Sequence, residues 1–122
     1  MELKHLHLHV RDRAVAEQFY AQWFHLTVAR RGESLTFMND EADFELALMD
    51  DPVPDALPAW FHFGFRLTTA EAVASLHQKM NVGGVRIVKP LYQDESLISY
   101  RCVDPDGHAI EVYWEAKGAP LD

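Results

Sequence analysis

Residues 4–10 of the chain read Lys4-His5-Leu6-His7-Leu8-His9-Val10. Side chains of a β-strand point alternately to opposite faces, so the three histidines share one face and the apolar residues share the other. The pattern predicts a strand whose apolar side packs on a core and whose imidazole side lines a cavity or meets solvent. An imidazole face can bind a metal ion, although an edge strand with solvated histidines gives the same pattern.

A similar alternating stretch occurs in the second half, Trp60-Phe61-His62-Phe63-Gly64-Phe65-Arg66-Leu67. Its odd-numbered positions are apolar, whereas its even-numbered positions carry tryptophan, histidine, glycine and arginine. His62 lies 57 residues after His5 (62 minus 5), and each histidine precedes an expected helix start by seven residues, at Asp12 and Thr69. A tandem duplication of one motif is the simplest explanation.

Each half also carries the signals of one helix and three further strands. Asp12 can cap a helix with an apolar stripe formed by Ala16, Phe19, Tyr20 and Trp23. In the second half, a capping-box pattern from Thr68 to Glu71 predicts a helix start, and Asn81-Val82-Gly83-Gly84 predicts its end. Strands are expected at residues 26–30, 34–38, 44–49, 85–88, 97–103 and 109–115.

The element order β-α-β-β-β therefore occurs twice. We expect an α+β fold in which two tandem βαβββ modules form a cup-shaped mixed sheet with the helices on its outer face. The composition, 48% hydrophobic and 25% charged, is typical of one globular domain covering residues 1–122. Module 1 is expected at about residues 1–50, a linker at 51–58 and module 2 at about 59–116.

The charge balance excludes some classes of partner. The formal net charge is −8, from 11 basic and 19 acidic residues, which disfavours binding to nucleic acid and to anionic membranes. Cys102 is the single cysteine, so no intrachain disulfide can form, and the N-terminus does not have a signal-peptide pattern. We therefore expect a cytoplasmic protein that acts on a small molecule.

The strand alternation places one glutamate of each half on the face opposite the core. Glu45 has this position in the strand at 44–49 and Glu111 in the strand at 109–115. If the two sheets curl toward a common concave surface, two imidazoles and two carboxylates converge, from His5, Glu45, His62 and Glu111. This donor set suits Zn²⁺, Ni²⁺, Co²⁺ or Fe²⁺. Each of these residues alone is equally well explained as a solvated surface side chain.

Three motifs extend this pattern: His5-Leu-His-Leu-His-Val-Arg-Asp12 followed by Phe19-Tyr20, then His62-Phe-Gly-Phe-Arg-Leu67, and Asp104-Pro-Asp-Gly-His-Ala-Ile-Glu111. Together they resemble the vicinal oxygen chelate superfamily over essentially the whole chain. That superfamily includes glyoxalase I, extradiol dioxygenases, fosfomycin-resistance transferases and bleomycin-binding proteins. The resemblance implies that His5, His62 and Glu111 are metal ligands and that Glu45 is the fourth ligand found in glyoxalase I.

The resemblance favours a glyoxalase-I-like lyase or isomerase that acts through a metal-bound enediolate. Glu111 or Glu45 would then be the catalytic base. The implied cofactor is a divalent ion (Ni, Zn, Co, Fe or Mn), with glutathione or another thiol as a cosubstrate. Two alternatives stay open: a small Fe(II) extradiol-type dioxygenase, which needs only three protein ligands, and a non-catalytic binding protein of the resistance type.

Strand alternation also indicates further cavity residues that could contact a substrate: His7, His9, Trp60, Arg66, Ser99 and Arg101. The two arginines could pair with an anionic substrate, or simply balance the acidic surface. His25, His77 and His108 are interpreted as structural or solvated. The resemblance to the glyoxalase I branch implies a homodimer. The sequence does not decide whether the metal ligands come from one chain or two.

Overall fold

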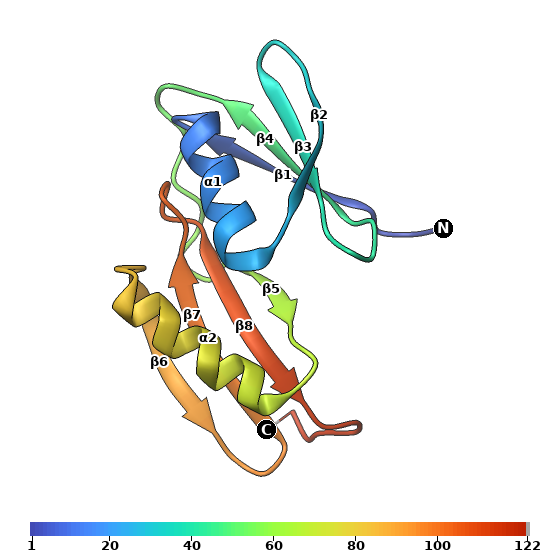
Figure 1. Cartoon of the computed structure of the whole chain (residues 1–122), viewed down its shortest axis with the longest axis vertical. Coiled ribbons are helices and arrows are strands. Elements are labelled where there is room, and N and C mark those ends of the chain that lie inside the picture. Colours follow the sequence, from blue (N-terminus) through green and yellow to red (C-terminus); the bar gives the residue numbers. More distant parts are fainter. Residues whose placement is uncertain (122) are drawn as a thin grey trace. The chain divides into compact units, whose positions relative to one another are not determined.

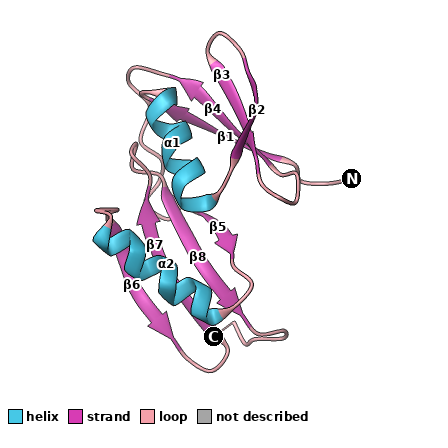
Figure 2. Ribbon diagram, in the orientation of Figure 1, coloured by secondary structure: helices cyan, strands magenta, loops and turns pink. Residues whose placement is uncertain are grey.

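The computed structural model describes residues 1–121 and divides into two compact units. The first unit is Met1–Leu57, and the second begins at Pro58. Each unit contains one helix and four strands (Figures 1 and 2). The sequence-based prediction of two βαβββ modules is confirmed.

The first unit places its four strands in one mixed sheet of order β1-β4-β3-β2, in which β1 and β4 run parallel and the other pairs run antiparallel. Its elements are β1 (His5–Val10), α1 (Arg13–Phe24), β2 (Thr27–Arg31), β3 (Leu35–Asn39) and β4 (Glu45–Asp50). Helix α1 covers one face of this sheet (Figure 1).

Helix α1 begins and ends where local chemistry requires it. The Asp12 carboxylate accepts hydrogen bonds from the backbone N–H groups of Ala14 and Val15, which would otherwise lack helical partners. At the other end His25 adopts a left-handed conformation with φ of 57° and donates its backbone N–H to the carbonyl of Tyr20. The buried helix face contains Ala16, Phe19 and Tyr20.

The second unit repeats the first. Its sheet has the order β5-β8-β7-β6, with β5 parallel to β8, and helix α2 lies along one face of it (Figure 2). The elements are β5 (Phe63–Arg66), α2 (Ala70–Val82), β6 (Ile87–Gln93), β7 (Leu97–Val103) and β8 (Ala109–Glu115). Since strand order and direction match between the units, the structure supports a duplicated motif.

Three expected boundaries in the second unit were wrong. The capping box predicted from Thr68 is wrong by one residue, because Thr69, the helix start expected from the repeat, caps α2 with a hydroxyl that accepts the backbone N–H of Ala72. Strand β5 starts at Phe63, so Trp60 and His62 lie in the segment before it. Strand β6 starts later and runs longer than expected, and it contains Pro90. A proline is tolerated there because β6 is an edge strand with irregular pairing.

The cores of both units are apolar and well buried. In the first unit Leu8, Val10, Met38 and Leu48 are at most 2% exposed, and in the second unit Val73, Met80, Ile98, Ile110 and Val112 are at most 1% exposed. In each unit the helix covers the apolar face of its sheet, which leaves the histidine- and glutamate-bearing face for other contacts. Neither helix within residues 1–121 has the length and hydropathy of a membrane-spanning segment.

Candidate functional site

His5 and Glu45 are direct neighbours in the first unit. They are paired in register on the adjacent parallel strands β1 and β4, and the backbone N–H of Glu45 donates to the carbonyl of Lys4 at 2.8 Å. The Glu45 side chain is 29% exposed, and its Oε2 lies 3.5 Å from Nη2 of Arg30. One imidazole and one carboxylate are therefore carried by neighbouring positions of adjacent strands in this unit, and their role as metal ligands stays a prediction.

His62 and Glu111 form the corresponding pair in the second unit. Nε2 of His62 lies 3.9 Å from Oε2 of Glu111, and both side chains are about one-third exposed, at 32% and 29%. Nδ1 of His62 lies 3.1 Å from the backbone carbonyl of Trp60. Because a carbonyl only accepts hydrogen bonds, Nδ1 carries the proton and Nε2 keeps its lone pair on the Glu111 side.

Each glutamate has a neighbour with an unsatisfied polar atom. Asn39 is paired in register with Glu45, and Arg101 is paired in register with Glu111. Their atoms Asn39 Oδ1 and Arg101 Nε are the two buried side-chain polar atoms without a hydrogen-bond partner in the described part of the chain. Leaving a buried polar atom without a hydrogen-bond partner is costly, so Asn39 Oδ1 and Arg101 Nε are positions where a ligand or a water molecule can complete the hydrogen bonding.

Arg101 also contacts the candidate ligand histidine. Its Nη2 lies 3.3 Å from Nε2 of His62, so the guanidinium donates to the lone pair that a metal ion would use. Arg101 therefore places a positive charge beside both His62 and Glu111.

The donor chemistry of both pairs fits a divalent transition ion. An imidazole with one nitrogen proton held by a backbone carbonyl is the usual arrangement of a metal-ligating histidine, and His62 has it. Imidazole together with carboxylate suits Zn²⁺, Ni²⁺, Co²⁺ or Fe²⁺. That the two pairs bind the same ion stays a prediction from the sequence.

The other predicted substrate-contact residues have different surroundings. Arg66 is held at the end of its own sheet, because its Nη2 donates to the carbonyl of Glu115 at 2.6 Å and its Nη1 lies 3.6 Å from the Glu115 carboxylate. Ser99 is 8% exposed and pairs in register with Tyr113 of β8. Trp60 is 74% exposed. Their contact with a substrate stays a prediction.

His7 and His9 lie on the same face of β1, with ring centres 5.1 Å apart and ring planes at 65°. Nδ1 of His9 lies 2.9 Å from Oδ2 of Asp51. This hydrogen bond, together with the backbone N–H of Val53, holds the pKa of the Asp51 carboxyl below its usual value. Asp51 was not among the sequence-based candidates.

Sequence reasoning also missed a cluster formed by Asp104, Asp106 and His108. One ligand atom from each lies within 4.8 Å of the others, a spacing that could hold a metal ion. The same atoms have a structural role, since Asp104 Oδ1 accepts the backbone N–H groups of Asp106 and His108, and Asp104 Oδ2 lies 2.7 Å from His108 Nδ1. From the sequence His108 is interpreted as structural or solvated, and the two carboxylates and the imidazole of Asp104-Pro-Asp-Gly-His108 were the available signal.

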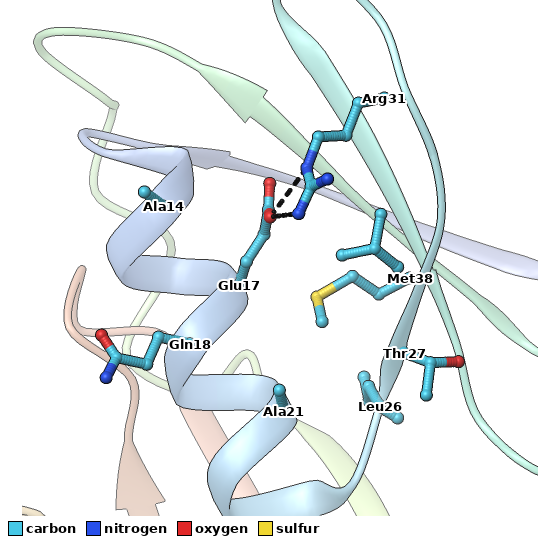
Figure 3. Close-up of a pocket in the computed structure, with 9 residues that line it drawn as sticks. Ala14, Glu17, Gln18, Ala21, Leu26, Thr27, Arg31 and Met38 are labelled. Atoms are coloured by element: carbon cyan, nitrogen blue, oxygen red, sulfur yellow. Dashed lines mark hydrogen bonds and ion pairs between the residues drawn. The ribbon is translucent and has the colours of Figure 1, made fainter.

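A second missed feature is an open hollow between α1 and strands β2 and β3, shown in Figure 3. Its volume is about 560 Å³, and Glu17 and Arg31 form an ion pair at its side, with a 2.7 Å contact. The hydrogen bond from Arg31 lowers the pKa of Glu17, and the Thr36 hydroxyl donates to the same carboxylate at 2.8 Å. This network joins α1 to the sheet.

The chain belongs to the Glyoxalase/Bleomycin resistance protein/Dioxygenase superfamily, whose family model matches residues 2–112. Among solved structures, a "possible Glyoxalase" from Bacillus cereus is 31% identical with a TM-score of 0.79, over 92% of this chain and 97% of that one. The superfamily resemblance seen in the motifs is thereby confirmed. No match was found among curated proteins.

Two more distant structures share the fold. The fosfomycin resistance protein FosX from Listeria monocytogenes is 21% identical with a TM-score of 0.78, over 95% of this chain and 94% of that one. The lactoylglutathione lyase from Agrobacterium tumefaciens is 18% identical with a TM-score of 0.73, over 93% of this chain and 92% of that one. At these identities the likeness concerns the fold alone.

Proposed function

We propose that the protein is a divalent-metal-dependent, glyoxalase-like lyase or isomerase. The observation that carries the proposal is the His62–Glu111 pair, in which the histidine tautomer is fixed with its Nε2 lone pair 3.9 Å from the carboxylate. The 31% identity to a "possible Glyoxalase" supports the same class of activity. We propose His5, Glu45, His62 and Glu111 as the metal ligands.

The proposed reaction uses a bound metal ion, a glutamate that transfers a proton, and an arginine that contacts the substrate. The bound ion supplies Lewis acidity that lowers the barrier to removing a proton next to a carbonyl group. Glu111 or Glu45 takes that proton and returns it to the adjacent carbon, which is general acid–base catalysis by a carboxylate. Arg101 offers its unpartnered Nε–H to an anionic oxygen of the substrate. His7, His9, Trp60, Arg66 and Ser99 are proposed as further substrate contacts.

The proposal includes three finer statements. The ion is Ni, Zn, Co, Fe or Mn, since all of them accept mixed imidazole and carboxylate ligands. The substrate is a carbonyl compound that reacts as an adduct with glutathione or another thiol. The protein acts as a cytoplasmic homodimer, so sedimentation is expected to give about twice the chain mass of 14.0 kDa. A monomer at all micromolar concentrations would contradict the dimer.

One observation favours an Fe(II) extradiol-type dioxygenase as the second candidate. Oε2 of Glu45 lies 3.5 Å from the Arg30 guanidinium, so this carboxylate already has a cationic partner. With Glu45 held there, His5, His62 and Glu111 would make a two-histidine, one-carboxylate site with open positions for oxygen and a catechol. The third candidate is a protein that binds a small ligand without converting it, and the activity assays below distinguish it from both enzymes.

Metal analysis and activity assays on the same preparations test the proposal. Wild type is expected to contain about one divalent ion per chain at this site and to isomerise methylglyoxal in the presence of one of several thiols. His62→Ala is expected to lose both, because it removes one ligand. His25→Asn is the control, since asparagine tolerates the left-handed backbone at that position and should change neither readout. Full metal content and activity in His62→Ala would refute the assignment.

A further inference from the structure

We propose that His7 and His9 form a separate transition-metal site on β1, which takes a borderline divalent ion such as Zn²⁺ on two imidazole nitrogens. The site uses neither His62 nor Glu111, and it does not rest on the proposed function. It gives His7 and His9 a metal-ligand role in addition to the substrate contacts proposed above.

The ring geometry fits two ligands of one ion. His7 and His9 are separated by one residue on β1, so their side chains project from the same face, and their ring centres are 5.1 Å apart. Two imidazoles bound to one tetrahedral ion at metal–nitrogen distances of about 2.0–2.1 Å also have ring centres about 5 Å apart. The observed separation of the ring centres is therefore compatible with ligation of one ion by both imidazoles.

The tautomer of His9 is set for metal binding. Its Nδ1 lies 2.9 Å from the Asp51 carboxylate, which accepts hydrogen bonds, so Nδ1 carries a proton and Nε2 of the neutral ring keeps its lone pair. A carboxylate behind a histidine in this way is typical of metal ligands, where it orients the ring and raises its basicity.

Asp51 is itself held in place. Its backbone N–H donates to the carbonyl of Val10 at 2.9 Å, and its Oδ1 accepts the backbone N–H of Val53 at 3.0 Å. The carboxylate is thus fixed relative to the end of β1, one residue beyond His9. Asp51 is a positioning residue in this site.

Both rings are accessible to a metal ion from solvent. His7 is exposed, and within residues 1–121 neither of its ring nitrogens has a hydrogen-bond partner, while the side chain of His9 is 49% exposed. The register partners of these histidines on β4 are Ala47 and Met49, neither of which carries a positive charge. Water molecules can supply the remaining ligands, as in other open metal sites.

The test follows each histidine ring separately. Ring-nitrogen NMR spectra of the full chain are recorded during titration with Zn²⁺, in wild type and in His62→Ala. Signals of His7 and His9 are expected to shift together in both proteins, whereas His25 should stay unchanged. Shifts at His5 and His62 without shifts at His7 and His9 would overturn this proposal while supporting the proposed function. Shifts at His7 and His9 without shifts at His5 and His62 would support this site and contradict the proposed function.

Variants separate ligation from ring contact. His9→Phe keeps an aromatic ring beside His7 but lacks the nitrogens, so Zn²⁺ binding at the site should be lost while the thermal midpoint stays close to that of wild type. Asp51→Asn should weaken Zn²⁺ binding by about tenfold, the usual effect of removing a group that orients a ligand histidine. Asp55→Asn is the matched control in the same linker. Wild-type Zn²⁺ affinity in His9→Phe and Asp51→Asn would overturn the proposal.

Discussion

Nε2 of His62 has two neighbouring groups of opposite charge, with Oε2 of Glu111 at 3.9 Å and Nη2 of Arg101 at 3.3 Å. The imidazole cannot donate from this nitrogen, because its proton is held on Nδ1 by the carbonyl of Trp60. Arg101 therefore uses the lone pair that a metal ion would need. Metal binding at His62 requires the guanidinium to release this nitrogen.

We expect Arg101→Met to tighten divalent-ion binding at His62. Methionine keeps an unbranched apolar side chain but does not compete for Nε2. A hydrogen bond to a charged group contributes about 1.5 kcal/mol, so the affinity should rise by about tenfold. Competition with a chelating dye measures this affinity. The same variant should have a higher KM for an anionic substrate, because the unpartnered Nε–H is removed as well.

Arg66→Met is the matched control for Arg101→Met. Arg66 also projects from the second sheet, but its guanidinium is bonded to Glu115. The control should leave metal affinity unchanged. An equal rise in both variants would mean that loss of general positive charge, not release of His62, causes the effect.

The lowered pKa of Glu17 predicts that the stability of the first unit depends on pH. Its pKa is lowered from the usual 4.5, chiefly by the Arg31 hydrogen bond, so the folded state favours the charged form. The stabilisation is fully present above the unfolded-state pKa and is lost as pH falls through the folded-state pKa. Glu17→Gln should therefore cost about 1–2 kcal/mol at pH 7 and much less near pH 3. Urea unfolding at both pH values measures the difference, which a pH-independent cost would contradict.

Cys102 should be inert in the folded protein. It is 0% exposed, and burial raises the pKa of its thiol to about 12, so almost no thiolate forms at pH 8. Alkylation by iodoacetamide should be slow in the native protein and fast in denaturant, as followed by intact mass. Ser34→Cys adds an exposed thiol and should be modified at once. Rapid native modification of Cys102 would contradict the observed burial.

Much of the fold followed from local patterns. The alternation in β1, the Asp12 cap of α1 and the end of α2 at Gly83 each have a direct physical cause in a few neighbouring residues. Strand boundaries were predicted wrongly where tertiary contacts determine them. Strand β6 is an example, because its edge position tolerates Pro90 and lets the strand extend to Gln93. Sequence patterns contain no such information on strand neighbours.

The candidate site was predictable only in part. Strand parity placed the four predicted ligands, and the structure pairs them as His5 with Glu45 and His62 with Glu111. Parity could not show that Arg101 bonds to His62, or that Asn39 and Arg101 each leave a buried atom without a partner among the described residues. These features depend on side-chain geometry across neighbouring strands, which strand parity does not describe.

Glu45 separates the leading function from its rival. If Glu45 is a ligand and takes part in proton transfer, Glu45→Gln should lower kcat of the isomerase reaction by about 10²–10⁴, the usual effect of removing a general base. Its free energy of unfolding should change little, because the lost ion pair with Arg30 is long at 3.5 Å and partly exposed. Glu41→Gln, in the exposed turn before β4, is the control and should keep full activity.

If the protein is instead a dioxygenase, Glu45 is not a ligand, and its contact with Arg30 is its main role. Glu45→Gln should then keep its Fe²⁺ and still cleave a catechol under oxygen, since His5, His62 and Glu111 remain. Assaying wild type and both variants with methylglyoxal plus thiols, and with catechols plus Fe²⁺, distinguishes these cases. Wild type that binds a small ligand but turns over neither class of substrate would reject both enzymes and leave the binding protein, for which Glu45→Gln should change affinity and not rate.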